Sequence, residues 1–130
     1  MPTYNRAGLI VDSIKSIRRQ TYSNSELFII DDGSSNNTEE VVLAFEDPRI
    51  HFSKVARTGV VGKLKNLGLS KATGNLIVFI DSDDMWNETK IEKQIAALQL
   101  YNEAGFCLLA DIISKPQPGY QILLPKKRWG

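Results

Sequence analysis

Three carboxylates lie within four residues, at Asp81, Asp83 and Asp84. They directly follow the apolar run 76–80, whose β-branched and aromatic residues predict a strand buried on both faces, as in a parallel sheet. Carboxylates this close repel one another unless they face water or share a cation. Hard oxygen ligands on a short loop suit Mg²⁺ or Mn²⁺ bound jointly with a substrate phosphate. The alternative is a solvated acidic turn in which Asp84 caps the next helix.

A second acidic group, Asp31 and Asp32, follows another apolar run at 26–30. Ligands of open α/β sheets bind outside the carboxyl ends of the strands. If the two strands are parallel and close, both acidic groups line one crevice. One group would then hydrogen-bond a base or ribose, and the other would hold a metal ion and a diphosphate.

Helices are expected before and between these strands. Ile10, Ile14 and Ile17 recur at helical spacing and predict a helix with one apolar face. Asn5 is placed to cap that helix, and Asn37 begins a capping box ahead of another. The predicted helices span 5–20, 37–46, 59–72 and 88–103, and the predicted strands span 26–30, 50–54, 76–80, 106–113 and 121–124. Strands that alternate with helices give an α/β fold with a mainly parallel sheet.

Composition limits the classes of function. The 130 residues make a single domain, 1–130, of which 42% is hydrophobic. The net charge of +1 gives no electrostatic case for a nucleic-acid partner. The apolar runs are too short for a transmembrane segment. Cys107 is the only cysteine and His51 the only histidine, so neither a disulfide nor a zinc site is expected.

Five sequence pieces together resemble a known family. In order they are PTYNR at 2–6, QTY at 20–22, IIDDGS at 29–34, KNLG at 65–68 and ATGNLIVFIDSDD at 72–84. At this spacing they are similar to the nucleotide-sugar half of the inverting family 2 glycosyltransferases. The resemblance covers Pro2 to about Ala110. It implies the GT-A fold, a Rossmann-like, three-layer α/β/α arrangement of nucleotide-diphospho-sugar transferases.

The resemblance implies how the nucleoside is bound. Tyr4 would lie against the base, with Pro2 and Thr3 beside it. Asp32 would hydrogen-bond the base, which would be uracil. Asp31 would be its neighbour and would cap the loop.

The resemblance also identifies 81–83 as a DXD motif. Asp81 would touch the ribose or the metal shell, next to Ser82, and Asp83 would be the direct ligand of Mn²⁺ or Mg²⁺. The family usually has Arg where Lys65 stands. Lys keeps the positive charge near the nucleotide but loses the planar fork of the guanidinium.

The implied reaction transfers a sugar from a UDP-sugar to an acceptor hydroxyl. The cation neutralises the diphosphate leaving group, and a general base deprotonates the acceptor. At the level of the family, the acceptor is a saccharide or a lipid-linked saccharide and the pathway makes a surface or capsular polysaccharide. The expected location is cytoplasmic, at the inner face of the membrane by peripheral association.

This sequence departs from the family at both ends. The family begins with a buried strand before PTYN and continues into an acceptor-binding half, so we expect a GT-A domain truncated at both ends. The general base is expected beyond the C-terminus, which predicts little activity for the chain alone. An open sheet edge would favour a homodimer.

Two other classes fit some of the residues. A receiver-type Mg²⁺-binding domain also carries an acid pair (Asp31, Asp32), a further acid (Asp81) and a Lys-Pro step (Lys115). However, only one helix and one strand separate Asp81 from Lys115, which is too little for that topology. A non-catalytic nucleotide-sugar-binding module would keep the DXD motif and lack the base.

Overall fold

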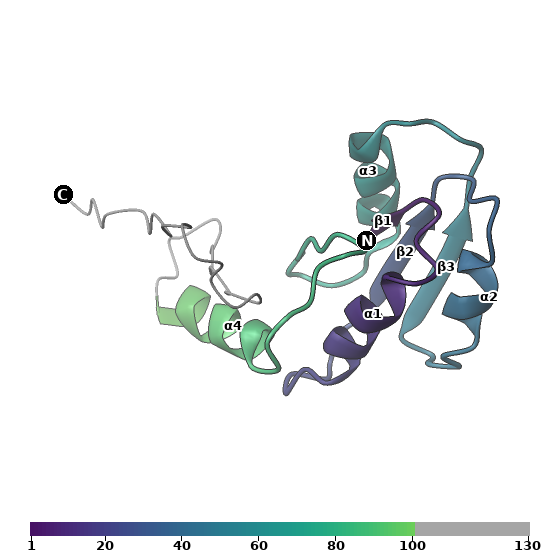
Figure 1. The fold of residues 1–130 in the computed structure, drawn as a ribbon. Helices are drawn as coiled ribbons and strands as arrows, with labels where there is room; N and C mark the ends of the chain where they lie inside the picture. The colour runs from purple at the N-terminus through teal and green to yellow at the C-terminus, as the bar shows by residue number, and fades with distance from the viewer. Residues whose placement is uncertain (101–130) are drawn as a thin grey trace, which may run out of the picture.

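The sheet is parallel and three-stranded in the part of the chain that the structure describes. The computed structural model describes residues 1–100 of the 130. Its strands are β1 (Pro2–Thr3), β2 (Leu27–Asp31) and β3 (Ile50–Lys54), in the order β1-β2-β3 (Figure 1). β2 pairs with both neighbours, with Thr3 opposite Asp31. The predicted α/β class and the strands at 26–30 and 50–54 are confirmed.

Helices cover both faces of this sheet (Figure 1). α1 (Ile10–Arg18) and α2 (Thr38–Leu43) pack on one face, and α3 (Val61–Lys71) packs on the other. The core on the first face consists of Ile10, Ile14, Ile17, Leu27, Ile29, Val42 and Ile80. On the second face, Phe28 and Ile30 lie against Gly68 of α3. Alternate residues of β2 therefore fill different layers, as the two-residue period of a strand requires.

Two predicted helix caps are wrong. α1 begins at Ile10, and Asn5 instead adopts a φ of 51° and accepts a hydrogen bond from Ser35 N at 2.9 Å through its side chain. Asn37 precedes α2 but makes no side-chain capping bond. The Asn5 side chain bonds to the loop at Ser35 instead, and next to Asn37 the Asn36 side chain accepts the hydrogen bond from Thr38 N at 3.2 Å.

The fourth helix, α4 (Lys90–Leu100), lies beside the C-terminal end of α1 (Figure 1). The Asn87 side chain accepts a hydrogen bond from Thr89 N at 3.1 Å at its start. The prediction that Asp84 caps this helix is therefore wrong. The predicted strands at 106–113 and 121–124, and Cys107, lie outside the described residues.

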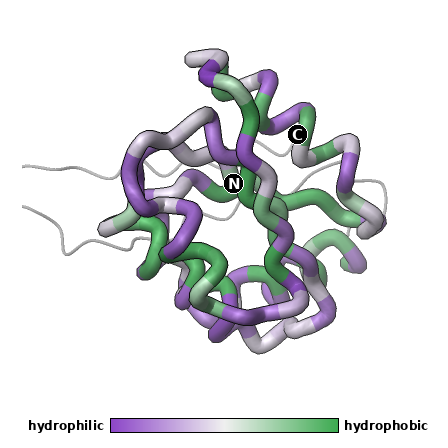
Figure 2. The backbone as a smooth tube through the Cα atoms, turned by 90° about the vertical axis from the view of Figure 1, so that its right-hand side faces the viewer, coloured by the Kyte–Doolittle hydropathy of each residue, from purple (hydrophilic) through white to green (hydrophobic). Residues whose placement is uncertain are grey.

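The predicted central strand at 76–80 is the main correction. The segment has no strand conformation, and Leu76, Ile77, Val78 and Phe79 are 41–53% exposed. Ile80 alone is buried and joins the core. A strand needs a neighbour with free backbone groups, and the nearest strand, β1, is only two residues long. In Figure 2, hydrophobic stretches of the backbone, drawn in green, lie at the outside of the molecule as well as at its centre.

An ion-pair cluster fixes the turn between α2 and β3. The Asp47 carboxylate is 6% exposed and receives Arg49 Nη2 at 2.7 Å and Arg18 Nε at 3.2 Å. Hydrogen bonds from the Arg49 side chain lower the pKa of Asp47 to about 2 against the opposing effect of burial. This cluster joins the end of α1 to the start of β3, away from the two acidic groups.

Candidate functional site

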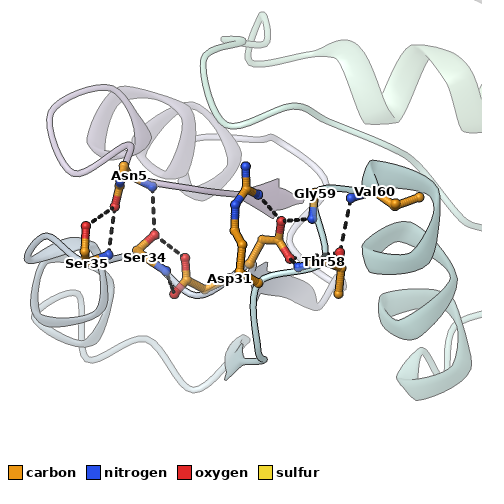
Figure 3. A network of polar contacts seen from close by, with 9 residues as sticks. Asn5, Asp31, Ser34, Ser35, Thr58, Gly59 and Val60 are labelled. Carbon is orange, nitrogen blue, oxygen red and sulfur yellow. Dashed lines mark hydrogen bonds and ion pairs between the residues drawn. The ribbon is translucent and has the colours of Figure 1, made fainter.

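Asp31 organises the loop that follows β2. Its side chain is fully buried and accepts hydrogen bonds from Ser34 N at 3.0 Å and from the Ser34 hydroxyl (Figure 3). The Ser34 hydroxyl in turn accepts one from Asn5 N at 2.7 Å. Asp31 therefore ties the loop after β2 to the loop after β1. These bonds engage its carboxylate inside the protein.

Gly33 lets this loop approach the next one closely. Its φ is +73°, in the left-handed region that favours glycine. A Cβ there would lie 3.0 Å from Arg57 N and 3.2 Å from Val55 O, both backbone atoms that cannot move easily. The IIDDGS sequence thus brings the loop at 55–60 against the carboxyl end of β2.

Asp32 is held by that second loop. Its side chain accepts hydrogen bonds from Thr58 N at 2.7 Å, Thr58 Oγ1 at 2.9 Å, Gly59 N at 2.9 Å and the Arg57 guanidinium. Burial alone would raise the pKa of Asp32, but the hydrogen bonds led by Thr58 N and Gly59 N outweigh it and lower the pKa to about 2. Asp32 is consequently an ionised acceptor at neutral pH.

Acid should destabilise the fold through Asp32 and Asp47, since both have a pKa of about 2 against an ordinary value of 3.8. A carboxyl with a lowered pKa gains its proton first in the unfolded chain. Its stabilising effect is complete above about pH 4 and is lost as the pH falls to about 2. We expect the urea midpoint at about pH 3 to lie below that at neutral pH. Asp47→Asn should flatten this dependence, and an equal midpoint at both pH values would contradict it.

Tyr4 lies against Arg57, one of the donors to Asp32. Its ring is 39% exposed, and the Arg57 guanidinium carbon lies 3.6 Å from the ring centroid. Pro2 and Thr3 are buried in β1, where Thr3 O accepts a hydrogen bond from Asp32 N at 2.9 Å. The four residues predicted to border the base thus meet at one end of the sheet. Sequence reasoning missed Arg57, which follows no apolar run and lies in no motif.

Residues 81–84, here called the acidic loop, expose the carboxylates of Asp81 and Asp83, and Ser82 is buried between them. Lys65 of α3 pairs with Asp81, with Nζ to Oδ1 at 3.2 Å. No ion pair or hydrogen bond engages the Asp83 side chain within residues 1–100. Over the same residues, no group of three metal-ligating side chains forms a closed cage.

β1 lies close to both acidic groups, the one at Asp31 and Asp32 and the one at residues 81–84. Its residue Thr3 bonds to Asp32, as described, and Met1 precedes it. Burial lowers the pKa of the Met1 amino group to about 6, and the nearby Asp81 carboxylate opposes that shift. Asp32 therefore meets β1 at Thr3, and Asp81 lies near Met1, the residue that precedes β1.

The model of the Glycosyl transferase family 2 matches residues 1–126, nearly the whole chain. The chain belongs to this family. The family match excludes the receiver-domain alternative and confirms that the chain is a glycosyltransferase by descent.

Among relatives of this glycosyltransferase is the Escherichia coli UDP-Glc:alpha-D-GlcNAc-diphosphoundecaprenol beta-1,3-glucosyltransferase WfgD. It is 42% identical over 106 residues, which are 82% of this chain but only 42% of WfgD. Staphylococcus aureus TarS 1–349 in complex with UDP superimposes with a TM-score of 0.74 at 27% identity, over 78% of this chain and 31% of the 1–349 chain. The mannosyltransferase PcManGT from Pyrobaculum calidifontis, in complex with GDP-Man and Mn²⁺, does so with 0.69 at 26% identity, over 75% and 30%. These GT-A structures confirm the predicted fold.

In this glycosyltransferase, Gln20 lies just after α1 and holds the chain that follows the acidic loop. Gln20 belongs to the QTY piece, and the sequence predicted no role for it. Gln20 is 6% exposed. Its Nε2 donates to Asn87 O at 2.7 Å, and its Oε1 accepts from Ile91 N at 3.1 Å. Ser16 Oγ accepts from Trp86 N at 3.1 Å one turn earlier. These bonds fix the chain just after 81–84.

Gln20→Ala should loosen the acidic loop. The substitution leaves Asn87 O and Ile91 N without their partner, at a cost of about 1–3 kcal/mol. We expect a lower unfolding midpoint, faster hydrogen exchange at Ile91 N and several-fold weaker Mn²⁺-dependent UDP binding. Thr21→Ala is the control, because the Thr21 hydroxyl bonds are exposed. Uridine affinity should not change, and a loss of uridine affinity equal to that of UDP would contradict a role at the acidic loop.

Proposed function

We propose that the chain binds the donor in an enzyme that transfers a sugar from a UDP-sugar to an acceptor hydroxyl. The observation that carries this proposal is that one of the two acidic groups is buried and the other is exposed. Asp32 is a buried, ionised acceptor next to the partly exposed Tyr4, which suits recognition of a neutral base, whereas Asp81 and Asp83 are exposed and suit a cation. Pro2, Thr3 and Tyr4 border the base in this proposal, and Asp31 supports the loop.

The choice of uracil follows from the chemistry of Asp32. An ionised carboxylate only accepts hydrogen bonds, so it selects a base that presents a ring N–H. Uracil and guanine have one at the relevant edge, while cytosine and adenine present an acceptor there, which a carboxylate repels. Two similar proteins favour uracil over guanine, because TarS 1–349 was solved in complex with UDP and WfgD is named for UDP-Glc as its donor.

The acidic loop has the donor set that Mn²⁺ or Mg²⁺ requires. Two exposed carboxylates without a closed cage fit an ion that keeps several waters and binds together with substrate phosphates. Asp83 would be the direct ligand, and Asp81 would lie in the metal shell or touch the ribose next to Ser82. Lys65 would hold Asp81 in place and add positive charge near the diphosphate. When bound, the cation neutralises the leaving diphosphate.

The acceptor is proposed from the relatives alone. WfgD is named for a diphosphoundecaprenol-linked sugar acceptor, and WcaA, 33% identical, for colanic acid biosynthesis. We infer a saccharide or lipid-linked acceptor in surface polysaccharide synthesis, at the cytoplasmic face of the membrane. Within residues 1–100, no helix has the length and apolar character to cross a bilayer.

A thermal-shift panel tests this proposal. A ligand that binds only the folded chain raises the unfolding midpoint by mass action. UDP, GDP, ADP and CDP are compared with Mn²⁺ and with a chelator. UDP with Mn²⁺ should give the largest rise, and CDP should give little. Equal shifts for all four nucleotides, or a purine preference, would contradict the assignment.

A further inference from the structure

The Arg57 side chain contacts both Tyr4 and Asp32. Its guanidinium carbon lies 3.6 Å from the Tyr4 ring centroid, which is within the range of a cation–π contact. The same guanidinium donates to Asp32 Oδ2. It thus covers both groups that are proposed to contact the base.

Asp32 also has no acceptor position left while Arg57 stays. A carboxylate offers about four acceptor sites. Thr58 N and Thr58 Oγ1 donate to Oδ1, and Gly59 N and Arg57 donate to Oδ2. An incoming ring N–H therefore finds all four acceptor positions of Asp32 taken, and the base finds Arg57 over the Tyr4 ring.

We propose that Arg57 is a displaceable cap on the base site, which a nucleotide must move off Tyr4 and Asp32 before it binds. This inference rests on the proposed function, because it takes Tyr4 and Asp32 as the base site. It gives Arg57 a role in setting nucleotide affinity and selectivity. No motif or family resemblance assigned such a role to this residue.

Among the donors to Asp32, Arg57 has the long and partly exposed side chain that can move into water. Its side chain is 51% exposed, whereas Asp32 is 2% exposed. Two of the other three donors are backbone N–H groups of Thr58 and Gly59, which are fixed by the loop. When Arg57 moves into water, the remaining three bonds still hold the carboxylate, and one position opens on Oδ2. A single opened position matches a single ring N–H, so the cap adds selectivity for bases that can replace the guanidinium.

The test compares uridine and UDP affinities by calorimetry for the wild type and Arg57→Ala. Removing the cap should tighten uridine binding by about threefold to thirtyfold, the worth of one cation–π contact at a partly exposed site. Arg57→Lys keeps the charge but loses the flat contact, and should give a smaller gain. Lys63→Gln, an exposed position on α3 that contacts neither acidic group, is the control for the lost charge. Thermal unfolding establishes that each variant folds.

Unchanged or weaker uridine binding by both Arg57 variants would overturn the cap. Weaker binding would instead place the guanidinium on the outer face of the bound base. The failure of the proposed function looks different: wild type and Asp32→Asn would then bind UDP equally. If Asp32→Asn loses UDP while Arg57→Ala gains nothing over Lys63→Gln, only the cap is wrong.

Discussion

UDP affinity should fall about 10- to 100-fold in Asp32→Asn, the loss expected when a hydrogen bond to a charged group is removed. The amide is neutral, and its NH₂ group would face the donors of Thr58 and Gly59. It therefore both lowers the acceptor strength and disturbs the loop. The measurement is calorimetry with UDP in the presence of Mn²⁺, at a temperature where the variant is folded.

Asp47→Asn is the matched control for this change. Asp47 is also a buried carboxylate with a pKa of about 2, but its partners are Arg18 and Arg49. It should lower the unfolding midpoint without changing the affinity for UDP. If the two variants lose UDP binding to the same degree, the effect of Asp32 is one of stability and not of base recognition.

Asp83→Asn should remove the metal-dependent part of UDP binding. Loss of a supporting residue around a metal costs about 10- to 100-fold in metal affinity, so loss of a direct ligand should cost at least as much. The quantity to measure is the ratio of UDP dissociation constants with a chelator and with Mn²⁺. That ratio should approach one in the variant, while uridine affinity stays unchanged.

The adjacent carboxylate of Asp84 supplies the control. Asp84→Asn removes the same charge from the same exposed loop. Its ratio should stay close to that of the wild type. Equal ratios for Asp83→Asn and the wild type would show that Asp83 is not the ligand.

Local patterns predicted the parts of the fold that depend on neighbours in sequence. The isoleucines of α1 face the core at the predicted spacing, and β2 ends in its acid pair as expected. The family resemblance, not a local pattern, implied that Asp31 caps the loop, and Ser34 N donates to its side chain at 3.0 Å. Each of these features depends on periodicity, or on a residue that bonds within three positions of itself.

The failures have a common physical cause, which is dependence on distant partners. An apolar run such as 76–80 forms a strand only when its backbone pairs with a neighbouring strand. The residues of the run do not show whether such a neighbour is present. Asn5 does not cap α1, because its side chain accepts a hydrogen bond from the backbone N of Ser35 instead. The Arg57 contacts with Tyr4 and Asp32 join residues far apart in sequence, and no spacing rule connects them.

Line broadening by Mn²⁺ in an amide-resolved NMR spectrum tests the central claim most directly. Mn²⁺ is paramagnetic, so it broadens the signals of the residues around it. With UDP present, a sub-stoichiometric amount should broaden Ser82, Asp83 and Asp84, and this effect should weaken greatly when UDP is left out. Broadening confined to other exposed acids, such as Glu40 or Glu46, or an effect independent of UDP, would contradict a joint site for the cation and the diphosphate.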